Sequence, residues 1–238
     1  MHLRVILPVT ARKLLQPVLE EAQSWASPGV TVDCAQIAHG PESIESDYDE
    51  AVATPGILTA VSQAVEDGVE GVFISCFAEP AVHAAREIAP FPVFGGFQPS
   101  VHAALGMADR IGILSILPDV VPGLDRKIAA YGLSQRIVDV GVIDMPVLDV
   151  DQHDLLLDRL EHVATDQIAR VRAEAFVLGC TGMLGVASGL QQRLRPTFGE
   201  IPVVDPTGAA ILALETAVRL GIRPSARAYH PPRPKQRT

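Results

Sequence analysis

Two short stretches decide the fold of this chain, Val72-Phe73-Ile74-Ser75-Cys76 and Phe176-Val177-Leu178-Gly179-Cys180. Each is a mostly apolar run that ends in a cysteine, the pattern expected of a parallel strand covered by helices on both faces. Each cysteine is therefore expected at the carboxyl end of its strand, close to the start of a helix. The two stretches lie 104 residues apart and give the first indication of an internal repeat.

Two further pairs of segments repeat at nearly the same offset. Residues 3–7 correspond to 111–115, and Pro92-Val93-Phe94 corresponds to Pro202-Val203-Val204. Three ordered matches at offsets of about 104 to 110 residues are hard to obtain by chance. The sequence therefore predicts two similar lobes, residues 1–108 and 109–206, with the C-terminal helix 207–221 as a candidate to complete the first lobe.

Short β-rich runs alternate with amphipathic segments in both halves, which specifies an α/β fold with parallel sheets. Strands are expected at residues 3–7, 30–37, 71–75, 92–95, 110–116, 135–142, 175–178 and 202–204. Helices are expected at residues 11–25, 55–67, 80–88, 101–108, 120–131, 151–174, 185–194 and 207–220, with Thr10 as N-cap of the first. Ligands of such sheets bind beyond the carboxyl ends of the strands, so we expect the site in the cleft between the lobes.

Composition and charge narrow the class of protein. The chain has 238 residues, of which 48% are hydrophobic, and its three cysteines argue against a disulfide scaffold. It has neither a secretion signal nor an apolar run near the roughly 18 residues of a membrane span, so we expect a cytoplasmic protein with no membrane partner. With 19 Lys and Arg against 28 Asp and Glu, the net charge of −9 argues against nucleic acid as a partner.

The segment 224–238 differs from the rest of the chain in its composition. It is rich in proline and carries basic residues without acidic ones. Because it lacks apolar periodicity, we predict a disordered, solvated basic tail.

The paired positions of Cys76 and Cys180 favour chemistry over packing. A thiol near a helix N-terminus has a lowered pKa, so its thiolate becomes available near neutral pH. A single cysteine is more often a small core residue, which is how we interpret Cys34, since it has no counterpart in the repeat. Two cysteines at equivalent strand ends are expected to face each other across the cleft.

Two facing thiols can form a disulfide, bind a metal, or act as acid and base. No cluster of His, Asp or Cys has metal-ligand spacing, and no G-x-G-x-x-G or P-loop motif is present, so no metal and no cofactor are expected. Acid–base groups on opposite sides of a bound carbon fit racemisation, in which one thiolate removes a proton and the facing thiol delivers one to the other face. The expected partner is a small-molecule substrate.

At these residues the sequence resembles the aspartate/glutamate racemase superfamily, and within it the hydantoin and allantoin racemases. The likeness runs from Leu3 to about Gly221. The cysteine motifs are typical of the superfamily, while a Gly-Pro-x-Ser-Ile-Glu loop at 40–45 and a Cys-Phe-x-x-Pro motif at 76–80 point to the hydantoin-racemase branch.

The resemblance implies cofactor-independent 1,1-proton transfer with Cys76 and Cys180 as the two bases, in a homo-oligomer that is often a tetramer or hexamer. Enolate charge would be held by backbone N–H groups at the two helix starts. These belong to Phe77, Ala78, Thr181 and Gly182. The hydroxyls of Thr10 and Ser43 would add contacts to the substrate.

Three positions depart from the pattern of the branch. The turn after the first strand is Leu7-Pro8-Val9-Thr10, where the branch commonly has Asn-Pro-Asn-Thr. Glu79 stands where Asp is usual, and Gln98 stands where an acidic residue is usual. Pro8, Glu79 and Gln98 are also expected to contact the substrate. The loss of polar groups relative to the branch predicts a less polar or differently shaped substrate.

Three functions remain open from the sequence. The first is a racemase of a 5-substituted hydantoin or a related compound. The second is another chemistry of the superfamily, namely amino-acid racemisation, arylmalonate-type decarboxylation or maleate-type isomerisation. The third is a non-catalytic ligand-binding protein on the same scaffold.

Overall fold

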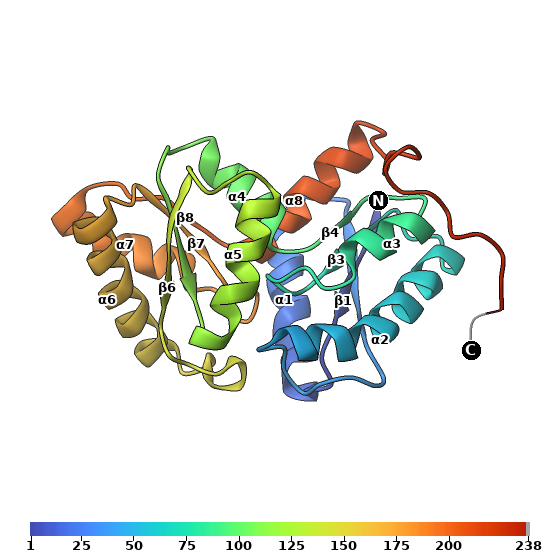
Figure 1. The fold of residues 1–238 in the computed structure, drawn as a ribbon, viewed down its shortest axis with the longest axis horizontal. Coiled ribbons are helices and arrows are strands. Elements are labelled where there is room, and N and C mark those ends of the chain that lie inside the picture. The colour runs from blue at the N-terminus through green and yellow to red at the C-terminus, as the bar shows by residue number, and fades with distance from the viewer. Residues whose placement is uncertain (237–238) are drawn as a thin grey trace.

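Two parallel sheets of four strands each organise the chain in the computed structural model, which describes residues 1–236. Figure 1 shows them in two lobes that lie side by side. Arg237 and Thr238, at the end of the segment expected to be a disordered tail, lie outside the described residues. The two-lobed α/β fold with parallel sheets is confirmed.

The first sheet has the strand order β2-β1-β3-β4. Its strands are β1 (His2–Leu7), β2 (Thr31–Gln36), β3 (Gly71–Ile74) and β4 (Val93–Phe94). Its helices include α1 (Leu15–Trp25), which follows a short 3-10 turn at Arg12–Leu14, α2 (Asp47–Glu66) and α3 (Val82–Ile88). Every residue of β3 is buried, as the apolar run predicts for a central parallel strand.

The second sheet repeats this arrangement with the order β6-β5-β7-β8. Its strands are β5 (Ile111–Ser115), β6 (Ile137–Val142), β7 (Ala175–Leu178) and β8 (Val203–Val204). Its helices include α5 (Val121–Ala130), α6 (His153–Val171) and α7 (Ala187–Phe198), and two 3-10 turns lie at Pro118–Val120 and Val147–Asp149. Strands β3 and β7 thus occupy the same place in their sheets, as the repeat predicts.

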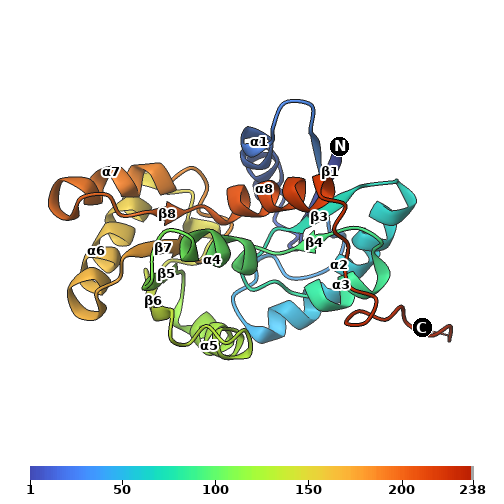
Figure 2. The ribbon, with the colours of Figure 1, turned by 90° about the horizontal axis from the view of Figure 1, so that it is seen from above.

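Each lobe receives one helix from the other half of the sequence. Helix α4 (Phe97–Leu105) packs Phe97 and Val101 against Ile111 and Val177 of the second sheet. Helix α8 (Pro206–Arg219) places apolar side chains in the core of the first lobe. Figure 2 shows α4 and α8 next to each other, and the two helices are in contact. The division of the chain at residue 108 stays a prediction.

Three expectations about helix starts are wrong, and the first is that of α4, which begins at Phe97 rather than at residue 101. Helix α2 begins at Asp47 rather than Pro55, because the Ser46 hydroxyl accepts the N–H of Asp49 (3.2 Å) and acidic residues follow in the first turn. Thr10 does not cap the first helix, since its hydroxyl donates to the carbonyl of Pro41 (3.2 Å).

The described part of the C-terminal segment, residues 224–236, runs along the outside of the first lobe (Figure 1). The hydroxyl of Tyr229 lies 3.0 Å from Nη1 of Arg86, which donates to it, and the Tyr229 ring lies against the same guanidinium. Disorder of the whole segment stays a prediction. Across residues 1–236, none of the helices has the length and apolarity needed to cross a bilayer.

Candidate active site

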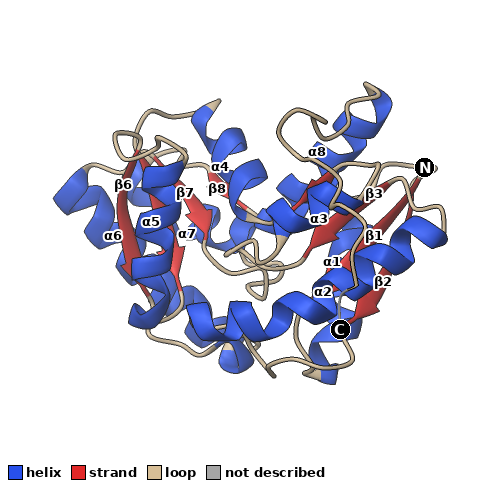
Figure 3. Cartoon of the chain, turned by 45° about the vertical axis from the view of Figure 1, so that its right-hand side comes forward, coloured by secondary structure: helices blue, strands red, loops and turns tan. Residues whose placement is uncertain are grey.

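The two cysteines lie on corresponding loops that face one cleft between the lobes. Cys76 follows β3 and Cys180 follows β7, and both side chains line the same cavity, which has a volume of about 80 Å³. Figure 3 shows the connecting loops gathered between the two sheets. The parallel strands end here in both lobes, so the repeat brings two thiols into one site.

The lining of the cleft has an apolar and a polar part. The apolar side chains come mainly from the turn after β1, from α1 and its preceding turn, and from loops of both lobes. They include Leu7, Pro8, Val9, Leu14, Val18, Ile44, Ile116 and Val147. The polar part comes chiefly from the start of α2 and from α5 with its preceding turn, and it includes Ser46, Asp47, Glu50, Asp119 and Lys127. Lys127 is the cation among these lining residues.

Backbone N–H groups point at both sulfurs. The N–H of Gly182 donates to Sγ of Cys180 (3.3 Å), and the N–H of Ala78 is directed at the sulfur of Cys76. Within residues 1–236, the N–H groups of Phe77 and Thr181 have no acceptor. Two unpaired donors beside two thiols can hold negative charge that develops on a bound molecule.

The expectation of lowered thiol pKa values is wrong for the free protein. Burial raises the pKa of Cys180 to about 11, against the opposing effect of the Gly182 N–H. Burial and, secondly, the carboxylate of Glu50 raise the pKa of Cys76 further. The physical reason is that α3 and α7 begin only at Val82 and Ala187, so no helix N-terminus follows either cysteine directly.

The structure brings most of the expected site residues together. Seven of them line the cleft: Pro8, Cys76, Phe77, Ala78, Cys180, Thr181 and Gly182. Thr10 and Ser43 are not among the lining residues, although Ile44 beside Ser43 is. Glu79 and Gln98 also lie outside the lining, and the backbone N–H of Gln98 donates to Oε1 of Glu79 (2.9 Å).

Glu79 is a buried residue that lies near the cleft but does not line it. Its Oε2 lies 3.7 Å from Nζ of Lys127, and Tyr131 donates to the same oxygen (3.4 Å). The side chain of Gln98 turns away from the cleft, and its Oε1 accepts a hydrogen bond from Nη2 of Arg86 (3.0 Å). The two residues therefore support the loops around the site.

Four charged residues of the cleft were missed from the sequence, namely Asp47, Glu50, Asp119 and Lys127, and two of them show why. Glu50 lies within the 40–50 stretch that carries the resemblance, and its place in the first turn of α2 became visible only once the Ser46 cap was known. Lys127 lies on α5 of the other lobe, and nothing in its local sequence distinguishes it from a solvent-facing lysine. Both residues reach the cavity because the two lobes pack against each other, and no local sequence pattern predicts that packing.

Fold and site together define a two-lobed enzyme with paired cysteines. The family described as Asp/Glu/Hydantoin racemase matches residues 3–214, and the chain belongs to this family. It is accordingly an isomerase of the racemase class. The resemblance found in the cysteine motifs is confirmed.

Individual relatives match nearly the whole chain. A hydantoin racemase of Rhizobium meliloti is 34% identical, over 93% of this chain and 90% of its own length. The solved structure of an allantoin racemase from Klebsiella pneumoniae is 30% identical, with a TM-score of 0.94 over 100% of this chain and 96% of that one. An allantoin racemase from Pseudomonas fluorescens gives 26% identity and a TM-score of 0.93, with both chains fully covered.

Proposed function

We propose that this protein racemises 5-substituted hydantoins by moving a proton between Cys76 and Cys180, without a cofactor. One observation carries the proposal: two cysteines from repeat-related loops line a single cleft, with backbone N–H groups directed at both sulfurs. The names of the relatives support a hydantoin ring as the substrate.

The proposed reaction removes one proton from the substrate and returns one, and the net charge of substrate and protein does not change. One cysteine, as thiolate, removes the proton from C5 of the ring, and the electron pair moves onto the neighbouring carbonyl oxygen as an enolate. The N–H groups of Phe77 and Thr181 are the free donors that can hold this charge. The opposite thiol then gives its proton to the other face of C5, so thiol and thiolate have exchanged places.

Burial of the thiols suits this chemistry. A thiolate whose pKa is raised by burial is a stronger base toward a weakly acidic carbon. The C5 proton of a hydantoin is more acidic than the α-proton of an amino acid, because a carbonyl and a ring nitrogen flank it. The match between base and carbon acid favours a hydantoin over a free amino acid.

The apolar part of the cleft favours an apolar substituent at C5. Leu7, Val9 and Ile44 line the cavity and present no hydrogen-bonding side chain. A ureido substituent, as in allantoin, would lose its hydrogen bonds to water against these residues, which is costly. We therefore propose aliphatic or aromatic 5-substituents as the preferred class.

The proposal is tested with an optically pure 5-alkyl hydantoin in D2O. Decay of optical rotation together with deuterium at C5, followed by NMR, is the expected result. A broad panel of hydantoins that shows neither would rule out this substrate class.

Single-cysteine variants separate the other chemistries. Cys76→Ala and Cys180→Ala should each abolish racemisation, since each removes one of the two proton-transfer groups. Decarboxylation needs one proton-delivering cysteine, and maleate-type isomerisation needs one nucleophilic cysteine. Full activity in either variant would therefore exclude the two-base mechanism.

We also propose that the protein acts in the cytoplasm as a homo-oligomer, a tetramer or hexamer. Support for the reducing compartment comes from the free thiols of Cys34, Cys76 and Cys180. Sedimentation equilibrium of the purified protein measures the oligomeric state, and a monomer would contradict this part of the proposal.

A further inference from the structure

Glu50 is a half-buried carboxylate without a partner among the residues that the structure describes. It lies in the first turn of α2, and its side chain lines the cleft beside Cys76. Its backbone carbonyl accepts the hydroxyl of Thr54 (2.8 Å). Among residues 1–236, however, no hydrogen bond or ion pair reaches its carboxylate oxygens.

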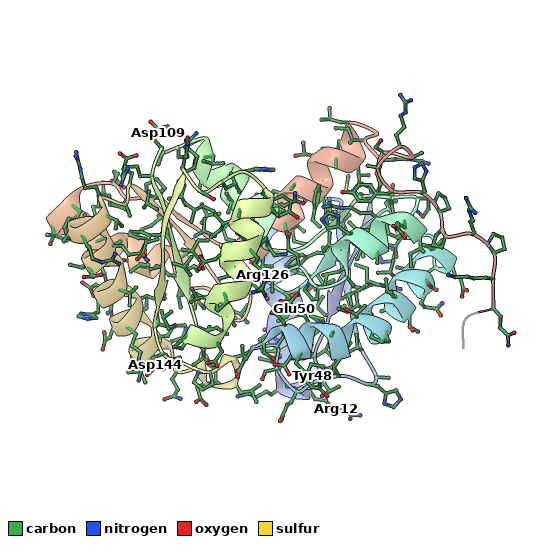
Figure 4. All side chains as sticks on the ribbon, viewed as in Figure 1. Arg12, Tyr48, Glu50, Asp109, Arg126 and Asp144 are labelled. Atoms are coloured by element: carbon green, nitrogen blue, oxygen red, sulfur yellow. The ribbon has the colours of Figure 1, made fainter. Side chains whose placement is uncertain are left out.

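The cations near Glu50 are already paired with other acids. Lys127 of α5 is paired with Glu79, which precedes α3, and Arg126 of α5 is paired with Asp47 of α2. Figure 4 places Glu50 and Arg126 in the region where α2 and α5 approach each other. Glu50 is thus the half-buried carboxylate in the polar part of the cleft that lacks a compensating donor among residues 1–236, whereas Asp119, which lacks one too, is exposed.

The electrostatic surroundings of Glu50 agree with this geometry. Burial raises its pKa to about 7, with smaller upward contributions from Asp47 and Glu79 and opposing ones from Lys127 and Arg126. A partly buried, unpaired carboxylate lowers the stability of a fold. Such groups are concentrated at functional sites, where a ligand supplies the missing interaction.

We propose that Glu50 accepts a hydrogen bond from a ring N–H of the substrate, and so selects cyclic ureides with a free N–H. The inference deepens the proposed function and rests on it. A hydantoin ring offers N–H groups on two edges, whereas the thiols act on C5. A fixed N–H contact on α2 would hold the plane of the ring between the two sulfurs.

Three substrates that share one 5-alkyl group test the contact: the parent hydantoin, its 1-methyl derivative and its 3-methyl derivative. For the wild-type protein we expect one N-methyl isomer to have a kcat/KM about 10-fold to 100-fold below the parent, the range for a hydrogen bond to a charged group. In Glu50→Ala the parent should fall by a similar factor, and the preference over that isomer should disappear.

The outcomes separate this inference from the proposed function. If the wild-type protein racemises the parent but handles both N-methyl isomers equally well, Glu50 makes no N–H contact and only the inference fails. The inference also fails if Glu50→Ala slows all three substrates by one common factor. If no hydantoin is racemised, both fail. Glu66→Ala, an exposed acid on the same helix, is the matched control and should leave all three values unchanged.

Thermal unfolding gives a readout that does not depend on activity. The pKa of Glu50 is higher in the folded than in the unfolded protein, so the wild-type protein loses stability as pH rises from about 4.3 to about 7. Glu50→Gln removes this loss, so its Tm should exceed that of the wild type at pH 8, by about 2–4 °C, and should match it near pH 4. A lower Tm at pH 8 would mean that Glu50 holds the structure and would overturn the inference.

Discussion

The loops after β3 and β7 occupy equivalent places, yet they surround their cysteines with different charges. In the second lobe, the N–H of Gly182 is directed at the sulfur of Cys180 and is the largest effect opposing burial, ahead of the upward effect of the Glu45 carboxylate. In the first lobe, the carboxylate of Glu50 is the largest effect after burial and raises the pKa of Cys76 further, ahead of the opposing N–H of Ala78. We therefore expect both thiols to be protonated in the free protein at neutral pH, and Cys180 to be the first to lose its proton as the pH rises.

The backbones of the two loops differ as well. The fifth residue after each cysteine is left-handed, with φ 59° at Ala81 and φ 68° at Gly185. Glycine adopts this conformation without strain, whereas alanine does not. The first loop therefore holds a strained residue at this position, where the second does not.

The largest effect is expected from removing one cysteine at a time. Racemisation should fall at least about 1000-fold in Cys76→Ala and in Cys180→Ala. Each variant should still exchange the C5 proton of one enantiomer in D2O, the one whose proton faces the remaining thiol. Chiral chromatography with mass detection of deuterium measures both quantities. Exchange of the same enantiomer by both variants would contradict the placement of the thiols on opposite faces.

A second, large effect is expected from pH. Because the raised pKa values leave both thiols protonated at neutral pH, kcat/KM should rise about tenfold per pH unit between pH 7 and 8.5. Initial rates by polarimetry, corrected for racemisation in buffer alone, give the profile. A flat profile over this range would show that a thiolate already exists at pH 7, contrary to the effect of burial.

A third effect concerns the charge difference between the loops. Glu50→Gln removes the negative charge beside Cys76, so the pKa of Cys76 should fall while that of Cys180 should not. Alkylation by iodoacetamide at pH 8, followed by peptide mass spectrometry, should be about three to ten times faster at Cys76 than in the wild type. Equal acceleration at Cys76 and Cys180 would point to an opened cleft instead.

The smallest effect is expected from exchanging the two left-handed residues. Gly185→Ala should lower the free energy of unfolding by about 1–2 kcal/mol, the cost of a left-handed alanine. Ala81→Gly should raise it by less than about 1 kcal/mol, because glycine also makes the unfolded chain more flexible. Urea unfolding of the two variants checks both signs. A loss of stability in Ala81→Gly would show that the methyl group of Ala81 contributes packing.

The sequence was sufficient for the strands and the cysteine pair, because both depend on local patterns. Apolar runs such as 72–74 identify central parallel strands, and the repeat places the two thiols at matching ends. It was not sufficient for α4, since an amphipathic helix has the same pattern whichever sheet it covers. The sequence also did not predict that Glu50 and Lys127 line the same cavity. The two residues lie on helices of different lobes and come near each other only when the lobes pack together.

The exchange of α4 and α8 has a consequence for how the chain can be divided. A polypeptide cut near residue 108 would leave each half with a helix whose apolar face belongs to the other half, and with a sheet lacking its own cover. Neither half is then a self-sufficient folding unit, although each resembles one by topology. The two fragments should instead associate with each other and fold together. The intact protein should unfold in one cooperative transition, because each lobe contains a helix from the other half of the chain.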